Sequence, residues 1–372
     1  MVAWLAVRFV KPFRALRYDE ERAGRLDDLV APPHDVITPE LHERLLAVSP
    51  YNSVRLVRPD DPLEAAAALR DWQEHGVLTR ERDEAVWVLE EEFTGPDGRI
   101  SKRRGLVARV RLEPYAEGRV LPHERTFPRQ KDVRLELLRA ARTKLSPILL
   151  LHGGESPDVP ARKADLQAEL EGTTSRLWRV TEPLAVDQAV ARVRGTLLIA
   201  DGHHRYETAL RFHEEDGTEE TGYVLAVLVS RDDPGLVILP THRLASAAPP
   251  ELDGAPIVDL PEALDELQRI PRGRAAFVLV RPEGAKVVRS RDAKLDTTVV
   301  DELPLQGVTY TASASEAERA VASGAAAAAF LVRAPTMEQV ESFARAGERM
   351  PPKSTYFFPK VTSGLLFSPF DE

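Results

Sequence analysis

The chain has 372 residues, of which 43% are hydrophobic and 29% charged, and its formal net charge is −9. This length supplies enough apolar side chains for one large domain or for two smaller ones. The absence of cysteine excludes disulfide bonds, thiolate metal sites and a cysteine nucleophile. The acidic balance, with charges of both signs interspersed, argues against a dedicated duplex-DNA-binding protein.

The amino-terminal sequence and the hydropathy indicate a cytoplasmic protein. The first ten residues, "MVAWLAVRFV", are too short for a secretory apolar core, and no small-residue cleavage pattern follows them. No window approaches the roughly 18 apolar residues of a membrane span. We therefore expect a soluble protein with no membrane partner and no nucleic-acid partner, whose oligomeric state the sequence leaves open.

The first half of the chain predicts a mixture of helices and strands. A proline in the first turn after Thr38 predicts a short helix, and a Pro-Asp-Gly turn predicts a β-hairpin. Helical periodicity with Val133 and Leu137 on one stripe predicts an amphipathic helix that is followed by a buried strand. In chain order these elements cover residues 40–47 (helix), 85–93 and 102–112 (hairpin), 131–145 (helix) and 146–153 (strand).

The second half alternates in the same way. Thr336 as N-cap, Gln339 three residues later and Gly347 as C-cap define the last helix most clearly. The predicted strands cover residues 197–200, 222–230, 235–244, 275–282 and 325–333, and the predicted helices begin at residues 206, 316 and 336. The Pro-rich segment 245–256 reads as a linker. We therefore expect a mixed α/β (α+β) fold with a domain at 1–245 and a smaller C-terminal α/β domain at 246–372.

The stretch "LLIADGHHRYETAL", residues 197–210, carries the strongest chemical signal. An apolar strand precedes Asp201 and a helical stripe begins at Tyr206, so residues 201–205 form a strand-to-helix turn. Such a turn presents backbone N–H groups at the positive end of the helix dipole, which suits a phosphate. Gly202 permits close approach of the backbone, and Arg205 adds a planar cationic fork.

The neighbouring polar residues leave alternatives open. His203 and His204 add donors whose charge changes near neutral pH. Asp201 could cap the helix, hold Mg²⁺ or accept a proton, and the simplest alternative is a capped helix start with two packed or exposed histidines. A three-histidine metal site that includes His34 or His123 is a further alternative. The chain contains none of the patterns GxxxxGK[ST], GxGxxG, GxSxG and HExxH.

Three other segments gather polar side chains. The loop "LPHERTFPRQK", residues 121–131, is either a solvated connection or a second wall of an anion site, and it contributes His123, Glu124, Arg125 and Arg129. The segment "MPPKSTYFFPKVTSG", residues 350–364, offers Lys353 or is a C-terminal strap. The segment "APPHDVI" offers Asp35, although Pro-Pro-X-Asp is also ordinary turn chemistry.

Six motifs, in order over nearly the whole chain, resemble the bacterial and archaeal family called domain of unknown function 1015. They are "APPHDVITPE", "SPYNSVRLV", "HERT", "IADGHHRYETAL", "LPTHRL" and "MPPKSTYFFPK". One departure is that His34 stands where the family motif has a tyrosine, which leaves the role of this position open.

A looser resemblance concerns the opening turn alone. Strand, Gly-x-x-Arg turn and helix are similar to the nucleotide-handling turn of the ParB and sulfiredoxin-like superfamily, whose free-serine kinases carry a similar "DGHHR" turn. The resemblance implies a ParB/sulfiredoxin-like core with an N-terminal extension. It also implies that Gly202, His203, His204 and Arg205 contact the phosphates of a nucleotide (ATP, ADP or CTP) or of pyrophosphate.

Together these features predict a phosphotransferase that acts on a small hydroxyl metabolite such as free serine, or on phosphoserine in reverse. Arg125, Arg129 or Lys353 would close over the donor phosphates, and Asp201 or Asp35 would hold Mg²⁺. Glu124 is the first choice and Asp201 the second for the group that accepts the hydroxyl proton, and His123 is a further catalytic candidate. The alternatives are a nucleotide-binding switch or slow NTPase with a protein partner, and a metabolite-binding protein without catalysis.

Overall fold

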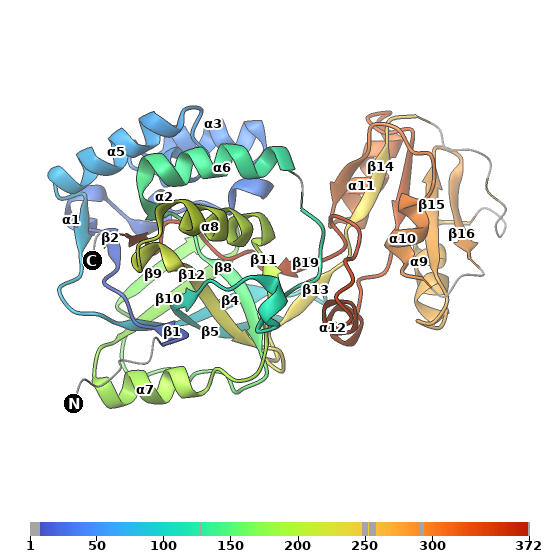
Figure 1. Cartoon of the computed structure of the whole chain (residues 1–372). Coiled ribbons are helices and arrows are strands. Elements are labelled where there is room, and N and C mark those ends of the chain that lie inside the picture. Colours follow the sequence, from blue (N-terminus) through green and yellow to red (C-terminus); the bar gives the residue numbers. More distant parts are fainter. Residues whose placement is uncertain (1–7, 127, 248–251, 253–257, 291–293, 371–372) are drawn as a thin grey trace. The chain divides into compact units, whose positions relative to one another are not determined.

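The computed structural model of the chain describes residues 8–126, 128–247, 252, 258–290 and 294–370 (Figure 1). The chain forms two compact units. Unit 1 comprises Met1–Pro122, Thr126–Leu236 and Pro359–Glu372, and unit 2 comprises His123–Arg125 and Val237–Phe358. Most of the predicted linker at 245–256 lies outside the described residues. The expected division at residue 245 into separate domains remains a prediction.

Unit 1 contains, in its described part, a nine-stranded mixed sheet. Its strands are β1 (Val10–Lys11), β4 (Val86–Thr94), β5 (Ile100–Arg111), β6 (Val120–Pro122), β8 (Ile148–His152), β9 (Leu166–Leu170), β10 (Thr173–Val180), β11 (Leu197–Asp201) and β12 (Tyr223–Ser230). The order is β6-β11-β8-β12-β5-β4-β10-β9, and β1 pairs with β5. The strands β8 and β12 run parallel, as do β6 and β11, whereas the other neighbours are antiparallel.

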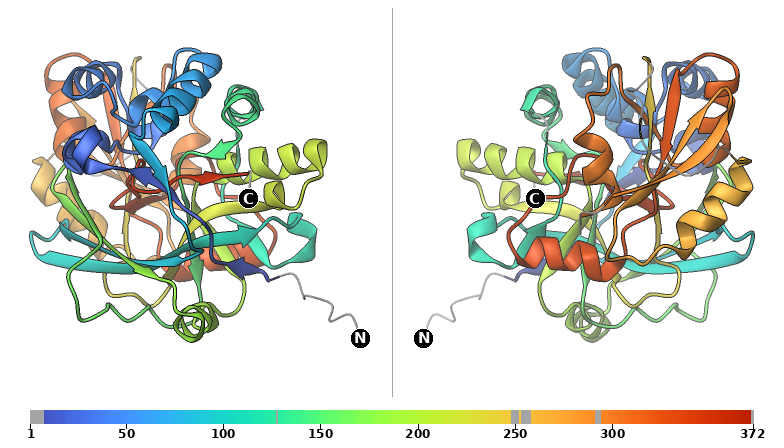
Figure 2. Two further views of the ribbon diagram at one scale, coloured as in Figure 1. Left: turned by 90° about the vertical axis from the view of Figure 1, so that its left-hand side faces the viewer. Right: turned by 90° about the vertical axis from the view of Figure 1, so that its right-hand side faces the viewer.

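Two small sheets complete the strands of unit 1: β2 (Leu16–Tyr18) pairs with β3 (Leu78–Arg80), and β7 (Thr143–Lys144) pairs with β20 (Ser368–Pro369). The helices are α1 (Glu20–Ala23), α2 (Leu26–Leu29), α3 (Pro39–Val48), α4 (Val54–Val57), α5 (Pro62–Glu74), α6 (Pro128–Ala141), α7 (Pro183–Ala191) and α8 (His203–Asp216), with short 3₁₀ turns at His34–Val36, Tyr115–Glu117 and Glu220–Gly222. Figures 1 and 2 show α5, α6 and α8 on one side of the strands β4 and β5, and α7 on the other.

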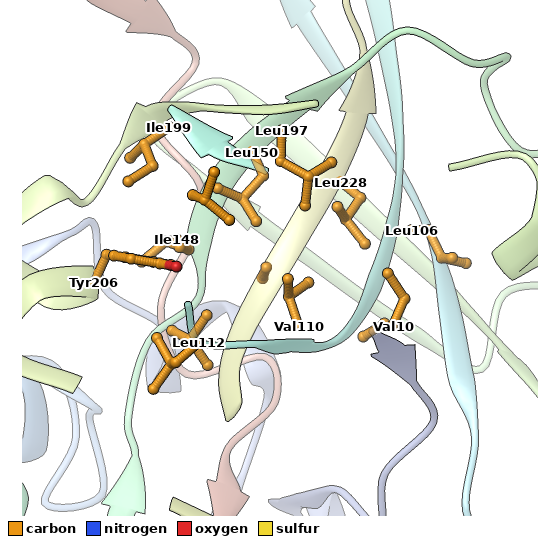
Figure 3. Packing of buried hydrophobic residues seen from close by; sticks show 14 of the residues in the cluster. Val10, Leu106, Val110, Leu112, Ile148, Leu150, Leu197, Ile199, Tyr206 and Leu228 are labelled. Atoms are coloured by element: carbon orange, nitrogen blue, oxygen red, sulfur yellow. The ribbon is translucent and has the colours of Figure 1, made fainter. Parts of the chain in front are cut away.

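The main core of unit 1 follows from the two-residue period of its central strands. Alternate residues of β5, β8, β11 and β12 contribute to one apolar cluster, in which Tyr206 of α8 also packs (Figure 3). Val186 of α7 belongs to the same cluster. Strands buried on both faces read as continuous apolar runs, as in "LLIA" and "YVLAVLV". This packing fixes the end of β11 and the start of α8, and so the turn that joins them.

Unit 2 contains a five-stranded antiparallel sheet in the order β16-β15-β18-β14-β17. Its elements are β14 (His242–Ala245), α9 (Leu260–Arg269), β15 (Ala276–Arg281), β16 (Gly284–Arg289), α10 (Asp296–Asp301), β17 (Thr309–Thr311), α11 (Ala314–Ala322), β18 (Ala328–Leu331) and α12 (Met337–Arg345). A separate pair joins β13 (Val237–Leu239) to β19 (Tyr356–Phe358). One face of the sheet packs against α9 and α11, and Val300 of α10 packs with the apolar side chains of the other face.

The predicted mixed α/β class is confirmed, and several local predictions hold. The hairpin of β4 and β5 closes through Gly95, whose carbonyl accepts a hydrogen bond from Gly98. The capping box of Thr336 and Gln339 begins α12 as predicted. Among the described residues, every helix is too short or too polar to cross a lipid bilayer.

Two predicted elements are wrong in extent. The helix expected over 131–145 ends at Ala141, because Arg142 takes a positive φ of 46° and Thr143 and Lys144 then pair with β20. The strand expected over 235–244 is two strands, β13 and β14, in different sheets, with Pro240 between them. Proline has no N–H to donate to a ladder, and this explains why one strand cannot continue through it.

Tyr206 provides a test of how the start of α8 is anchored. Its buried hydroxyl donates to the carbonyl of Glu113 at 2.8 Å and accepts the N–H of Glu113 at 3.0 Å. We expect Tyr206→Phe to lower the free energy of unfolding by about 1–3 kcal/mol, because it leaves two backbone groups without this partner. The matched control is Tyr115→Phe, whose half-buried hydroxyl contacts Glu207 at 3.3 Å and for which we expect a loss below about 1 kcal/mol. Equal losses in urea unfolding would contradict this role.

Candidate functional site

The turn between β11 and α8 is tighter than the sequence predicts. The strand extends to Asp201 and the helix begins at His203, so that Gly202 alone makes the turn, with φ 95° and ψ 27°. A Cβ at position 202 would lie 2.6 Å from Cγ2 of Ile148. Only glycine meets both the backbone angle and the space. Because Gly202 is the N-cap residue, the alternative in which Asp201 caps the helix is wrong.

Asp201 is the centre of an ion-paired group in unit 1. Its Oδ2 accepts from Nη2 of Arg205 at 2.6 Å, and its Oδ1 accepts from Nζ of Lys360. The side chains of Asp201, Arg205 and Lys360 are only 13%, 10% and 11% exposed. Arg205 also donates to Oγ of Ser146 at 3.2 Å and to the carbonyl of Pro147. The guanidinium fork of Arg205 is therefore engaged on several sides.

Arg134 of α6 brings a third cation to this group. Burial and the neighbouring Arg205 lower the pKa of Arg134, and Asp35 and Asp201 partly oppose this effect. Its Nε lies 3.2 Å from Nε2 of His34, a residue that is also 3.8 Å from Asp35. The lowered pKa means that the surroundings of Arg134 disfavour its charged form, mainly through loss of hydration and secondly through the charge of Arg205. We call Asp201, Arg134, Arg205 and Lys360 the Asp201 cluster.

The charge of the Asp201 cluster suits an anion. Its three cations exceed its one carboxylate, and Asp35 nearby supplies only one more negative charge. The positive end of the α8 dipole adds to this field. Gly202 has no side chain to cap the first turn of α8. A phosphate or carboxylate at this helix start would be attracted by charge and by helix geometry alike.

Unit 2 holds a second group of predicted residues. Oε1 of Glu124 accepts the backbone N–H of Lys353 at 3.0 Å, and Lys353 has a positive φ of 57°. The ring of His123 is fully buried, with Nε2 2.9 Å from Oγ1 of Thr355 and an edge-on contact to Phe357. The motifs "HERT" and "MPPKSTYFFPK" thus meet within unit 2, mainly through buried and backbone contacts.

The motif "LPTHRL" supports this second group. Arg243 is fully buried and makes two bonds of 2.9 Å to Asp301, and its Nη1 donates to the carbonyl of Lys353 at 3.0 Å. Burial, together with the charge of Arg243, lowers the pKa of His242 to about 4, so that this histidine is neutral at pH 7. Arg243 thus holds the segment at 350–355 in place, whereas His242 accepts the backbone N–H of Val332 at 3.2 Å.

The predicted site residues therefore divide between the units. Asp35, Asp201, Gly202, His203, His204 and Arg205 belong to unit 1, with His203 buried and His204 half-buried, whereas His123, Glu124, Arg125 and Lys353 belong to unit 2. Arg125 is exposed, and the side chain of Arg129 lies outside the described part of the chain. The roles of all these residues remain predictions.

Arg134 and Lys360 are not among the site residues that the sequence predicts. Lys360 is the last residue of the motif "MPPKSTYFFPK", in which the sequence points to Lys353. Arg134 lies on the predicted amphipathic helix, where a charged residue reads as an ordinary solvated position. In both cases the partner is distant in the sequence, 159 residues away for Lys360 and Asp201.

The same residues do not form a ready site for a metal ion. Over the described ranges, no three His, Asp or Glu side chains gather in a way that could hold a metal ion. Both oxygens of Asp201 accept from cations, so Mg²⁺ at Asp201 would require one of these ion pairs to open. The arrangement as it stands fits an anion better than a cation.

The chain belongs to the family described as "Protein of unknown function (DUF1015)", whose model matches residues 10–306. Among solved structures it is similar to a free serine kinase in complex with AMP, at 18% identity and a TM-score of 0.40, over 68% of this chain and 86% of that one. It is also similar to a conserved hypothetical protein from Pyrococcus furiosus (16%, TM-score 0.38, 68% and 92%) and to SbnI with a C-terminal truncation from Staphylococcus aureus (12%, 0.36, 68% and 85%). No match was found among curated proteins. The expected ParB/sulfiredoxin-like core remains a prediction.

Gly202→Ala tests the geometry of the turn. Gly217, at the other end of α8, has a φ of 72° with no atom within 4 Å of a built Cβ, so it is a matched control for backbone strain. We expect Gly217→Ala to cost about 1 kcal/mol, and Gly202→Ala to cost at least about 1 kcal/mol more, because Ile148 must also move. Urea unfolding of both variants measures the difference. Equal costs would show that the contact with Ile148 is not a constraint.

Proposed function

We propose that this member of the DUF1015 family is a phosphotransferase that uses a nucleotide or pyrophosphate and acts on a small hydroxyl metabolite. The observation that carries the proposal is the Asp201 cluster, in which three cations meet at the amino end of α8 beside a glycine turn. Phosphoryl transfer depends mainly on positioning and on neutralising phosphate charge, and such a cluster supplies both.

The Asp201 cluster suggests different roles for its cations. Arg205 is held by Asp201, Ser146 and Pro147, so it would act mainly through its charge and by fixing the turn. Arg134 is half-buried and its partner is a histidine ring, which leaves its charge less compensated. We therefore propose that Arg134 and Lys360 make the first contacts with the donor phosphates, together with the amides of the first turn of α8.

The finer parts of the proposal are the metabolite that receives the phosphoryl group and the residue that accepts the proton of its hydroxyl group. Free serine is the first acceptor to assay, because the "DGHHR" turn resembles that of free-serine kinases. Glu124 remains our first choice for the group that accepts the hydroxyl proton, since both oxygens of Asp201 already accept from cations. Mg²⁺, if bound with the donor, would neutralise phosphate charge, and we assign no step to it.

Arg134→Met tests the phosphate site. Loss of one charge-assisted contact, worth about 1.5–3 kcal/mol, should weaken the binding of ADP or pyrophosphate roughly 10- to 150-fold. The control is Arg139→Met on the same helix, whose exposed side chain pairs with Glu215 and whose loss should change the affinity less than about twofold. Isothermal titration calorimetry, with and without Mg²⁺, measures both. Similar affinities for the two variants would contradict a phosphate site at the Asp201 cluster.

Glu124→Gln tests whether the protein is an enzyme. Glutamine keeps an acceptor for the N–H of Lys353 but cannot take up a proton, so folding and nucleotide affinity should be preserved. We expect phosphate transfer to serine to fall by about 100-fold or more, the range typical for loss of general base catalysis. The readout is ³²P transfer to serine and related small alcohols. Unchanged transfer would exclude Glu124 as the base, and tight nucleotide binding by the unmodified protein without any transfer would favour a nucleotide-binding switch.

A further inference from the structure

Unit 1 contains a cavity beside the Asp201 cluster, and the apolar wall of this cavity has no role in the proposed function. It lies between α6, β7 and α8, with a volume of about 60 Å³ that water can occupy. At about 10–15 Å³ of such volume per water molecule, the cavity has room for roughly four to six waters or for a ligand of a few heavy atoms. Much of its wall is apolar and includes Leu137, Leu145, Ala209 and Val224. We call it the Lys144 pocket.

Lys144 is the unusual residue of this wall. It is 6% exposed, and its Nζ has no hydrogen-bond partner among the residues that the structure describes. Nζ lies over the ring of Phe370, 4.7 Å from the ring centroid. Burying an ammonium group without a hydrogen-bond acceptor destabilises the fold. Packing alone therefore does not explain why a lysine occupies this position. Burial and the adjacent Arg109 lower the pKa of Lys144 to about 7.

The other polar groups that line the pocket are also cations or hydrogen-bond donors, so they too favour an anionic ligand. Arg134 and Arg205 also line it, whereas no aspartate or glutamate does within the described ranges. Oγ1 of Thr208, which is buried in the same wall, likewise lacks a hydrogen-bond partner in the described part of the chain. The pocket thus offers a cation and a hydroxyl donor beside apolar surface, and no negative charge of its own.

We propose that the Lys144 pocket binds a small carboxylic acid of two to four carbons, with its carboxylate at Lys144 and Thr208 and its carbon chain against the leucines. One negative charge on the ligand then balances one positive charge on the lysine. The inference goes beyond the proposed function, because an acid can bind here whether or not phosphate is transferred. Arg205 lines this pocket and also belongs to the Asp201 cluster, so a bound acid would lie next to the phosphate site proposed above.

Such binding is coupled to a proton. At pH 8.5 most of Lys144 is neutral, and a bound carboxylate stabilises the charged form and so raises the pKa of Lys144. Binding must then take up a proton, and the affinity should fall by up to about tenfold per pH unit above pH 7 while staying nearly constant between pH 6 and 7. The other charged groups that face Lys144 or its pocket are Arg109, Arg134 and Arg205. Burial and the neighbouring Arg205 lower the pKa of Arg134 to about 9, so Arg134 still stays mostly charged at pH 8.5.

Butyrate is the probe for this test, with butylamine and inorganic phosphate as comparisons, all titrated calorimetrically into the full chain at pH 6.5 and 8.5. We expect butyrate to bind at least about tenfold more tightly at pH 6.5, with proton uptake at pH 8.5 in buffers of different ionisation enthalpy. Lys144→Met keeps the shape of the side chain and should abolish both the binding and the proton uptake. Lys102→Met, at an exposed lysine of β5, should change neither.

The alternative outcomes overturn the proposal. Butyrate affinity that is the same in Lys144→Met, or that does not depend on pH, would exclude Lys144 as the partner. Binding of phosphate but not of butyrate would assign the pocket to a different class of anion. No binding of any probe to the unmodified protein would overturn the proposal. If Lys144→Met then also had an unfolding midpoint at least as high as that of the unmodified protein, Lys144 would be a merely tolerated buried cation. Affinity for ADP, measured in parallel, reports on the phosphate site separately.

Discussion

The ion pairs of Asp201 with Arg205 and Lys360 connect three parts of unit 1: a strand, the helix that follows it, and a segment 159 residues later in the sequence. Asp201 ends a central strand, Arg205 lies one turn into the following helix, and Lys360 belongs to the segment that returns from unit 2. All three side chains are nearly buried, so removal of one partner would leave an uncompensated charge in a poorly solvated place. The turn, the helix start and the returning segment therefore depend on one another, and so does any site built from them.

The segment of unit 1 that begins at Pro359 is held by contacts at more than one point. The carbonyl of Pro359 accepts from Arg103 at 2.7 Å, and Ser368 accepts from Arg109 at 2.7 Å while its strand pairs with β7. This pairing is also what ends α6 early and turns Lys144 inward. One segment thus supplies a cation to the Asp201 cluster and shapes the wall of the Lys144 pocket, which links the two candidate sites through packing rather than through a shared ligand.

Local patterns in the sequence were sufficient for much of the fold. The capping box at Thr336, the Pro-Asp-Gly hairpin and the strand before Asp201 are decided by neighbours within a few residues, and these predictions hold. Where a partner that is distant in the sequence determines where an element ends, the sequence does not predict that end correctly. The end of α6 depends on β20, more than two hundred residues later, and no local residue marks it.

The same distinction applies to the candidate site. The glycine turn could be predicted because its chemistry is contiguous, from Asp201 to Arg205. Arg134 and Lys360 could not, because a lone arginine on a helix and a lone lysine after a proline carry no local signal of a partner. For the loop with "HERT" the sequence leaves a solvated connection and the wall of an anion site both open. His123 in this loop and Arg243 in "LPTHRL" are fully buried, because distant groups satisfy them in the fold.

The position of Lys360 in the chain also has a consequence for biosynthesis. Unit 1 is interrupted: its main body is made before residue 237 and its last segment only after residue 358, once the polypeptide of unit 2 has been made. On the ribosome, the central sheet can form while Asp201 and Arg205 still lack their third partner. The Asp201 cluster is therefore completed late in synthesis, and a nascent chain with a folded sheet does not yet hold the third ionic partner of Asp201.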